Sequence, residues 1–191
     1  KNNLKNQAIW KNKKKVIKFI NYLLESKYLY NFNWLGVPII QYPSDIVVLQ
    51  ELIYKQKPDV IIECGIGHGG MLLFYASNLK LMNIKNFKII GIDVLIKKKN
   101  RKIIESHPLS KNIKLYETSS IDQNFFKKLK KNKTITNNPK IIILDSNHTK
   151  NHVYKELELY STLLKKKEYI IVMDTIIEFI NKNFSKGKTF K

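Results

Sequence analysis

Five short apolar runs, each bounded by turn residues, constrain the fold more than any other feature of this sequence. They are rich in β-branched residues and have the length of buried strands. The stretches between them carry apolar residues at helical spacing. This alternation predicts an α/β fold, Rossmann-like and doubly wound, with a mostly parallel sheet and helices on both faces. The expected strands cover residues 60–63, 88–93, 113–118, 140–145 and 169–174.

Segments with helical spacing lie before and between these runs. Residues 44–56 follow Pro43 and stop before Pro58, and prolines at such places commonly begin and end helices. The lysine- and asparagine-rich segment 130–139 is expected to be an exposed loop. The other expected helices cover residues 14–25, a segment beginning near Met71, and the segments marked by apolar residues over 121–129 and 153–164.

The chain of 191 residues fits a single globular domain, and its net charge of +20 invites a nucleic-acid-binding interpretation. The positive charge is almost entirely lysine, because Arg101 is the only arginine, and the lysines are spread along the chain. Nucleic-acid-binding proteins use arginine for two-pronged contacts and gather positive charge in a compact patch. We therefore expect a solvated basic surface and no nucleic-acid partner.

The cysteine content and the hydropathy of the sequence indicate the cellular compartment of the protein. Cys64 is the only cysteine, so the sequence offers neither an internal disulfide nor a cysteine-rich zinc site. The apolar stretch over residues 16–20 is short and interrupted by Lys18, so it predicts neither a secretion signal nor a membrane span. These features predict a cytoplasmic protein.

A glycine-rich turn follows the first expected strand. Gly65, Gly67 and Gly70 satisfy the spacing G-x-G-x-x-G of dinucleotide-binding turns, so a nicotinamide cofactor has to be considered. Glycines let the backbone approach a ligand closely, and the next helix offers free N–H groups to an anionic group. A tight turn without a ligand is the structural alternative. We disfavour it, because the turn contains a fourth glycine, Gly69, and ordering four glycines on folding costs conformational entropy.

Two acidic residues bear on the choice of cofactor. Glu63 stands two residues before the first glycine, which resembles the acidic-x-Gly-x-Gly signature of class I methyltransferases. In those enzymes the turn holds the methionine part of S-adenosylmethionine. Asp93 ends the second expected strand and is placed to accept hydrogen bonds from both ribose hydroxyls, a role that fits either cofactor.

Further oxygen ligands follow the fourth and fifth expected strands. Asp145 ends one, and Asp174 with Thr175 ends the other. Because parallel strands end at the same edge of a sheet, these residues are expected to converge. Two carboxylates with extra oxygen donors suit a hard cation such as Mg²⁺, which would lower the pKa of a bound hydroxyl. Simple strand-end and capping roles are the alternative.

His148 lies three residues after Asp145, where the next helix is expected to open. Its unperturbed pKa lies near neutrality, so it is a candidate general base beside a catalytic Asp145. A helix-capping role is an equally weighted alternative. His152, one turn further on, is expected to be a surface or packing residue.

Ordered blocks of residues along most of the chain resemble the cephalosporin hydroxylase family, a branch of the class I methyltransferase-like proteins that includes sugar O-methyltransferases. They begin near Trp34 and run to Thr175. The blocks are Trp34-Leu35-Gly36-Val37-Pro38 with Gln41, Pro43 and Asp45; Lys57-Pro58-Asp59 to Glu63; Gly69-Gly70; His107-Pro108; Ser119-Ser120 with Asp122; Asp145-Ser146 with His148-Thr149; His152-Val153; Glu156-Leu157; Tyr160; and Asp174-Thr175.

The resemblance implies a domain division, cofactors and a reaction. Residues 1–33 would form an N-terminal helical extension and residues 34–191 a methyltransferase-like domain. S-adenosylmethionine would bind at the glycine turn and Asp93, and Mg²⁺ near Asp145 and Asp174. Adenine-side contacts would come from Ser119, Ser120 and Asp122. The implied activity is O-methylation, with a sugar hydroxyl of a glycan or a secondary metabolite as acceptor.

The chain also departs from the family pattern. Met173 stands where members usually carry a glutamate, so one expected metal ligand is missing. Five strands are predicted where seven belong, and an incomplete sheet edge would favour a homo-oligomer. Three alternatives stay open: a dinucleotide-dependent oxidoreductase, an RNA methyltransferase whose RNA affinity falls steeply with salt, and a non-catalytic cofactor-binding member of the fold.

Overall fold

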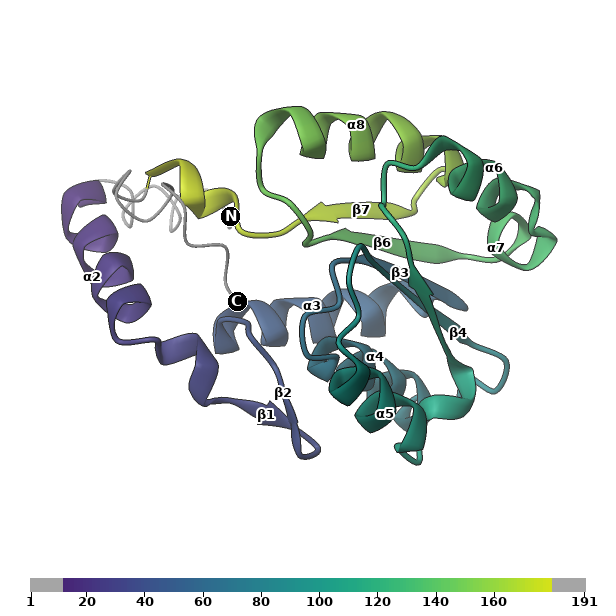
Figure 1. Cartoon of the computed structure of the whole chain (residues 1–191), viewed down its shortest axis with the longest axis horizontal. Coiled ribbons are helices and arrows are strands. Elements are labelled where there is room, and N and C mark those ends of the chain that lie inside the picture. The colour runs from purple at the N-terminus through teal and green to yellow at the C-terminus, as the bar shows by residue number, and fades with distance from the viewer. Residues whose placement is uncertain (1–11, 180–191) are drawn as a thin grey trace.

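All five expected strands form and join one parallel sheet in the computed structural model, which describes residues 12–179, with side chains described through residue 177. The order across the sheet is β5-β4-β3-β6-β7, so the chain winds outward from β3 in both directions. This confirms the predicted doubly wound α/β class (Figure 1). The strands are β3 (Val60–Cys64), β4 (Lys88–Asp93), β5 (Ile113–Glu117), β6 (Lys140–Leu144) and β7 (Tyr169–Val172).

Strand register brings the ends of the central strands level. Cys64 at the end of β3 pairs with Ile92 on β4 and with Leu144 on β6. Every residue of β3 and β6 is buried, which explains why their sequences are mostly apolar and do not alternate. The predicted fourth and fifth strands extended to Asp145 and Asp174, but the structure ends both earlier, so these acids lie beyond the sheet edge.

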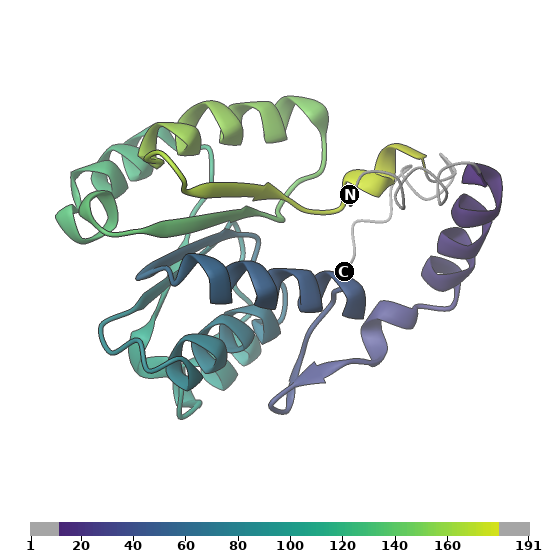
Figure 2. The same cartoon turned by 180° about the vertical axis from the view of Figure 1, so that it is seen from behind.

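Helices cover both faces of the sheet, and each face has its own apolar core (Figures 1 and 2). One core packs Ile61, Ile89 and Ile141 against helices of the first half, and the other packs Ile62 and Ile142 against helices of the second half. Burial of each such side chain contributes about 1.5–3 kcal/mol. The first layer contains α3 (Pro43–Gln56), α4 (Gly70–Leu81) and α5 (Lys98–Ser106), and the second contains α6 (Gln123–Lys131), α7 (Lys133–Asn137) and α8 (Lys150–Tyr160).

The second layer corrects one prediction. The segment 130–139 was expected to be an exposed loop, but it contains the end of α6 and the whole of α7. The Asn132 side chain caps α7 by accepting a hydrogen bond from the Thr134 N–H, and Ile135 is 1% exposed in the core. A cap and one buried apolar residue therefore outweigh the polar composition. Helix α8 also ends at Tyr160, short of the predicted 164.

Helix α5 was not predicted at all. Its sequence is dominated by charged residues, but Ile104 is 1% exposed and Asn100 is also buried. A single buried face on a short basic segment gives little periodic signal. The sequence showed only a lysine cluster at this place.

The N-terminal part stands beside the carboxyl ends of the strands (Figure 1). It consists of α2 (Lys13–Glu25), the 3-10 turn η1 (Tyr28–Asn31) and a small antiparallel hairpin of β1 (Asn33–Trp34) and β2 (Val37–Pro38). Trp34 anchors the hairpin, because its indole N–H donates to Ser77 on α4 at 3.0 Å. The predicted division at residue 33 stays a prediction. None of the helices within residues 12–179 has the length and apolar character needed to span a bilayer.

Candidate active site

The candidate site lies where β3, β4, β6 and β7 end. The strands are parallel, so the loops that follow them emerge at one edge of the sheet. Backbone hydrogen bonds tie these loops together: Gly65 N–H donates to the Ile92 carbonyl at 2.8 Å, and Asp145 N–H donates to the Cys64 carbonyl at 2.8 Å. The glycine turn, Asp93 and Asp145 are therefore held in one framework.

Two glycines of the turn, Gly65 and Gly67, have positive φ angles but different surroundings. Gly65 has a positive φ of +94°, and a side chain there would overlap the backbone carbonyl of Asp145. Gly67 also has a positive φ of +55°, but nothing lies within 4 Å of where its side chain would be. The first glycine thus allows two strand ends to approach each other, and the second leaves open space above the turn.

Polar side chains hold the turn in place. Asp93 Oδ2 accepts a hydrogen bond from the Ile66 N–H at 2.8 Å, and its Oδ1 accepts one from the Leu95 N–H at 3.1 Å. Asn100 on α5 donates to the Gly67 carbonyl at 3.0 Å. Each carboxylate oxygen can accept more than one hydrogen bond, so Asp93 retains acceptor capacity for the predicted ribose contact.

Glu63 lies beneath the turn and is 1% exposed. Its Oε1 accepts a hydrogen bond from the Tyr75 hydroxyl at 3.0 Å, while its Oε2 is buried and has no partner among the described residues. Burial raises the pKa of Glu63 well above the ordinary value, and the nearby Asp145 raises it further. A direct contact between Glu63 and a cofactor stays a prediction.

Asp145, His148 and Asp174 converge as the sequence predicted for the strand ends. His148 Nε2 lies 3.9 Å from Asp145 Oδ1 and 3.6 Å from Asp174 Oδ2. One ligand atom from each of the three residues can be chosen so that all lie within 4.8 Å of one another. We call these three residues the acid–histidine cluster. Their side chains are 17%, 28% and 32% exposed in chain order, so the cluster is sheltered but open to a ligand.

The electrostatics of the cluster favour a positive charge within it. Burial raises the pKa of Asp145 well above its ordinary value, and the charge of Asp174 raises it further. Burial also raises the pKa of Asp174, which His148 lowers in turn. Asp174 adopts a left-handed backbone conformation with φ +54°, a strained geometry that is common at functional sites. Two close, sheltered carboxylates are stabilised by a cation.

Gln41 is a residue of this site to which the sequence assigned no role. It is 3% exposed, and its Nε2 donates to Asp145 Oδ2 at 2.6 Å. This leaves Asp145 Oδ1 facing His148. The two residues are 104 positions apart, so no local pattern could have predicted the contact. Only its place among the resembling blocks singled out Gln41.

The residues around Asp174 differ in burial. Met173 is 7% exposed and belongs to the apolar core. Thr175, the third predicted metal ligand, is exposed at the start of the 3-10 turn η4 (Thr175–Phe179). Asp45 at the start of α3 lies close enough for its charge to raise the pKa of Asp174. The sequence assigned Asp45 no role at the metal site and singled it out, like Gln41, among the blocks that resemble the family.

A second polar group lies beside α8. Ser120 Oγ is 3.1 Å from His152 Nε2, which lies 3.3 Å from Glu156 Oε1. Ser146 donates to the same Glu156 oxygen at 2.6 Å, and Glu156 is fully buried. His152 thus belongs to a polar group that links Ser120, on the predicted adenine side, to Ser146 in the loop after β6.

The other two predicted adenine-side residues flank this group. Asp122 caps α6 by accepting a hydrogen bond from the Phe125 N–H at 2.6 Å. Ser119 is half-buried, and its carbonyl accepts a hydrogen bond from the Asp122 N–H at 3.0 Å. Contacts of Ser119, Ser120 and Asp122 with a cofactor stay predictions.

The donor set of the acid–histidine cluster fits a divalent cation. Carboxylate oxygens are the protein ligands that Mg²⁺ prefers, whereas imidazole suits later transition metals. Asp145 and Asp174 could hold Mg²⁺ and leave the His148 ring free to accept a proton. The site would also hold a cofactor. The open space at Gly67 and the free N–H groups at the start of α4 suit an anionic group of that cofactor.

Comparison with known proteins identifies the family. The family model described as rhamnosyl O-methyltransferase/CmcI matches residues 26–191. This chain belongs to that family. The predicted resemblance to the cephalosporin hydroxylase family is thereby confirmed.

Curated relatives agree with the assignment. The rhamnosyl O-methyltransferase of Mycobacterium leprae is 26% identical over 142 residues, which cover 74% of this chain and 59% of the relative. The rhamnosyl O-methyltransferase of Mycobacterium tuberculosis is 26% identical over 145 residues, with 75% and 57% covered. The chain thus spans less than two thirds of the length of these relatives.

Solved structures share the fold. A CmcI structure with Mg and SAM matches with a TM-score of 0.58 and 22% identity, covering 82% of this chain and 62% of that one. A structure assigned as a caffeoyl-CoA O-methyltransferase from Staphylococcus aureus matches with a TM-score of 0.59 and 17% identity, covering 91% and 81%. At these identities the comparison confirms the methyltransferase fold.

Proposed function

We propose that this protein is an S-adenosylmethionine-dependent O-methyltransferase that acts on a sugar hydroxyl with the help of a divalent cation. The observation that carries the proposal is the convergence of the glycine turn and the acid–histidine cluster at one edge of the sheet, in a member of the rhamnosyl O-methyltransferase/CmcI family. The names of the curated relatives support a sugar acceptor, and the CmcI structure with Mg and SAM supports both cofactors.

The cofactor would lie across the strand ends. The turn with Gly65, Gly67, Gly69 and Gly70 would bind its methionine part, with Glu63 supporting the turn from below, and Asp93 would accept hydrogen bonds from the ribose. Ser119, Ser120 and Asp122 would line the adenine side. S-adenosylmethionine would supply a methyl group bound to a positively charged sulfur, and the rest of the cofactor would leave as a neutral thioether.

The acid–histidine cluster would prepare the acceptor hydroxyl. Asp145, Asp174 and Thr175 would hold Mg²⁺, which lowers the pKa of a bound hydroxyl. His148 would accept the hydroxyl proton at Nε2, and the carboxylates of Asp145 and Asp174, 3.9 and 3.6 Å from this nitrogen, would stabilise the imidazolium that forms. Asp145 and His148 are thus the proposed catalytic pair.

The alternatives have less support. A nicotinamide dinucleotide would use the glycine turn and Asp93, but it leaves the acid–histidine cluster without a role. A non-catalytic role would leave the sheltered carboxylates unexplained, and their burial costs stability. RNA methylation rests on net charge alone.

Binding and activity measurements test the proposal. Isothermal titration should detect S-adenosylmethionine binding and no binding of NADH. Asp145→Ala should abolish methyl transfer to a rhamnoside while S-adenosylmethionine still binds. Lys55→Ala on α3, where the exposed lysine pairs with exposed Glu51, is the matched control and should remain active. Binding of NADH without S-adenosylmethionine would refute the proposal in favour of a dehydrogenase.

Location and partners are also proposals. We infer a cytoplasmic location, supported by the single cysteine, whose buried thiol is free. We propose a small-molecule or glycan partner and no nucleic acid. Self-association as a homo-oligomer is supported by the position of β7 at one edge of the sheet.

A further inference from the structure

Helix α8 carries polar side chains at four-residue spacing: His152, Glu156 and Tyr160. Residues four apart lie on the same face of a helix. This face contacts two loops at the edge of the sheet. Tyr160 donates to the Ser120 carbonyl at 3.0 Å in the loop after β5, and Glu156 accepts a hydrogen bond from Ser146 in the loop after β6. One helix therefore joins the predicted adenine side of the site to the loop that follows β6.

Short polar contacts run without a break between these two loops. Ser120 Oγ lies 3.1 Å from His152 Nε2, which lies 3.3 Å from Glu156 Oε1. The same Glu156 oxygen accepts a hydrogen bond from Ser146 Oγ at 2.6 Å. We call these four residues the α8 bridge. Ser146 directly follows Asp145, whose carboxylate belongs to the acid–histidine cluster.

The positions of the hydrogens in the α8 bridge follow from its chemistry. A carboxylate oxygen only accepts hydrogen bonds, so the His152 Nε2 next to Glu156 carries a hydrogen. Ser120 Oγ accepts from the same N–H, which leaves its own hydrogen for a ligand. The α8 bridge therefore fixes the Ser120 oxygen and leaves one donor available at the predicted adenine side.

The stability of the fold does not account for Glu156. This residue is fully buried, and its Oε2 has no hydrogen-bond partner among the described residues. A buried carboxylate with such an oxygen costs free energy, and apolar residues in place of buried charged groups are often neutral or stabilising. The contacts of Glu156 are therefore better explained by a role in the site.

Glu156 also lies within electrostatic reach of the metal side of the site. Burial and the charge of Asp174 raise the pKa of Asp145, and the charge of Glu156 raises it further. Gln41 already holds one oxygen of Asp145 at 2.6 Å. The α8 bridge holds the next residue along the chain. Two restraints from different parts of the fold thus act on this metal ligand.

We propose that the α8 bridge couples the two ligands of the site, with Glu156 as its central positioning residue. A cofactor bound at Ser120 strengthens metal binding at Asp145, and the metal strengthens cofactor binding by the same factor. Ordering one end of a connected group lowers the entropy cost of ordering the other end. The effect is reciprocal because both ligands share one thermodynamic cycle. This inference rests on the proposed methyltransferase function.

Mn²⁺ and the demethylated cofactor S-adenosylhomocysteine are the probes for this coupling. S-adenosylhomocysteine lacks the positive charge on sulfur, so it does not repel the metal through that charge. We expect saturating S-adenosylhomocysteine to tighten Mn²⁺ binding to the wild type by about tenfold, a typical coupling between two sites. Electron paramagnetic resonance measures the Mn²⁺ affinity, and isothermal titration measures the reciprocal effect on S-adenosylhomocysteine.

Variants of α8 separate coupling from structure. Glu156→Leu removes the central carboxylate and should reduce the effect to less than about twofold, while each ligand alone still binds. Glu156→Gln keeps an oxygen that accepts from Ser146 and His152, so it should retain the coupling. Glu158→Leu, at an exposed position of the same helix, is the matched control and should also retain it. A purely structural role of Glu156 would weaken both ligands and leave the coupling factor unchanged.

Ser146→Ala breaks the α8 bridge at its other end. It removes one hydroxyl group and the hydrogen bond to Glu156, so it should reduce the coupling as Glu156→Leu does. Because this change is small, it decides the question even if Glu156→Leu does not fold. Circular dichroism verifies the fold of every variant.

The outcomes separate this proposal from the proposed function. Equal Mn²⁺ affinity of the wild type with and without S-adenosylhomocysteine would overturn the coupling proposal. Full coupling in Glu156→Leu or Ser146→Ala, or its loss in Glu156→Gln or Glu158→Leu, would do the same. In all these cases S-adenosylhomocysteine still binds. Failure of S-adenosylhomocysteine to bind the wild-type protein would instead refute the methyltransferase function.

Discussion

Gln41 offers a test of how the proposed metal ligand Asp145 is oriented. Its amide holds one oxygen of Asp145 and leaves the other for the acid–histidine cluster. We expect Gln41→Met, which keeps the volume but removes the donor, to weaken Mn²⁺ binding by about tenfold, as for other residues that orient metal ligands. Electron paramagnetic resonance of Mn²⁺ measures the affinity without requiring turnover.

The control for this prediction is another glutamine nearby. Gln50 lies on α3 and is exposed, so Gln50→Met should bind Mn²⁺ as the wild type does. Equal Mn²⁺ affinity in the two variants would show that Gln41 has only a packing role.

Glu63 provides a pH test of burial. Its pKa in the folded protein is raised above the ordinary value. At a pH between the ordinary glutamate pKa and this raised pKa, Glu63 is ionised in the unfolded chain but protonated in the folded one. The free energy of unfolding therefore falls as the pH rises through this window. Glu63→Gln removes this loss. We expect the thermal midpoint of Glu63→Gln to exceed that of the wild type by more at about pH 8 than at about pH 5.

The exposed residue Glu51 is the control for Glu63. Its side chain is 64% exposed, and Glu51→Gln should shift the midpoint little and by similar amounts at both pH values. A Glu63→Gln midpoint that follows the wild-type pH profile in parallel would contradict the prediction.

At the scale of elements, one buried ion pair joins the start of β6 to the turn before β7. Lys140 Nζ lies 3.0 Å from Glu168 Oε2, with side chains 0% and 9% exposed. We expect Lys140→Met to lower the free energy of unfolding by about 3 kcal/mol, because Glu168 would be left as a buried charge without its partner. Urea unfolding measures the change.

Two further variants complete this test. Adding Glu168→Gln to Lys140→Met should restore most of the lost stability, because the unpaired charge is removed. Lys55→Met, which breaks an exposed pair with Glu51, should cost less than about 1 kcal/mol. A double variant no more stable than Lys140→Met alone would indicate that the damage comes from packing.

The elements that sequence could predict are those with strong periodic or positional signals. The strands of the sheet are nearly continuous apolar runs, and parallel strands must end at one edge, so the meeting of Asp145 and Asp174 followed from topology. Helix α7 was missed because one buried residue, Ile135, and one cap carry it. Gln41 was missed as a functional residue because its partner is distant in sequence.

At the scale of the whole molecule, both helical layers pack on the same sheet, so ligand binding at its edge should stabilise all of it. At about 100 times its dissociation constant, S-adenosylmethionine adds about 2.7 kcal/mol. We expect a single calorimetric transition whose midpoint rises by about 5–10 °C for a chain of this size. Separate transitions, or an equal rise with NADH, would contradict this.

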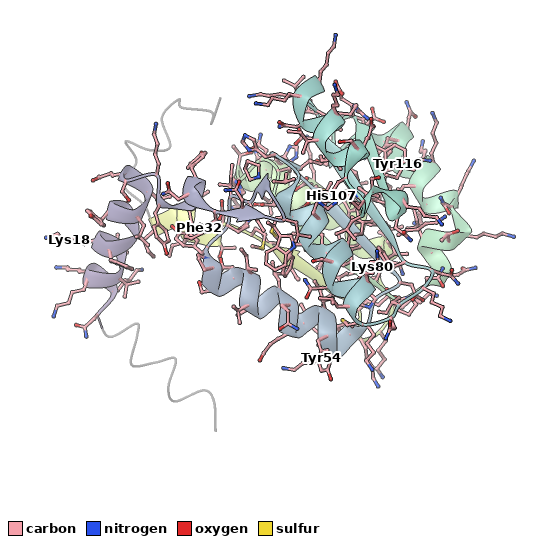
Figure 3. All side chains as sticks on the ribbon, turned by 90° about the horizontal axis from the view of Figure 1, so that it is seen from below. Lys18, Phe32, Tyr54, Lys80, His107 and Tyr116 are labelled. Carbon is pink, nitrogen blue, oxygen red and sulfur yellow. The ribbon has the colours of Figure 1, made fainter. Side chains whose placement is uncertain are left out.

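The basic surface is spread over the whole molecule rather than gathered at one place. Figure 3 shows nitrogen-tipped side chains around the outline, with Lys18 on α2 at one end of the view and Lys80 over the body of the molecule. Such a distribution gives long-range attraction without a binding site.

The contact between Gly65 and the Asp145 carbonyl has an evolutionary consequence. Because a methyl group at position 65 would displace the loop that carries Asp145, the turn proposed to bind the cofactor and the loop proposed to activate the acceptor cannot diverge independently. Descendants of this chain that bind a different donor or acceptor should therefore vary the residues around the contact between Gly65 and Asp145 and retain the contact itself.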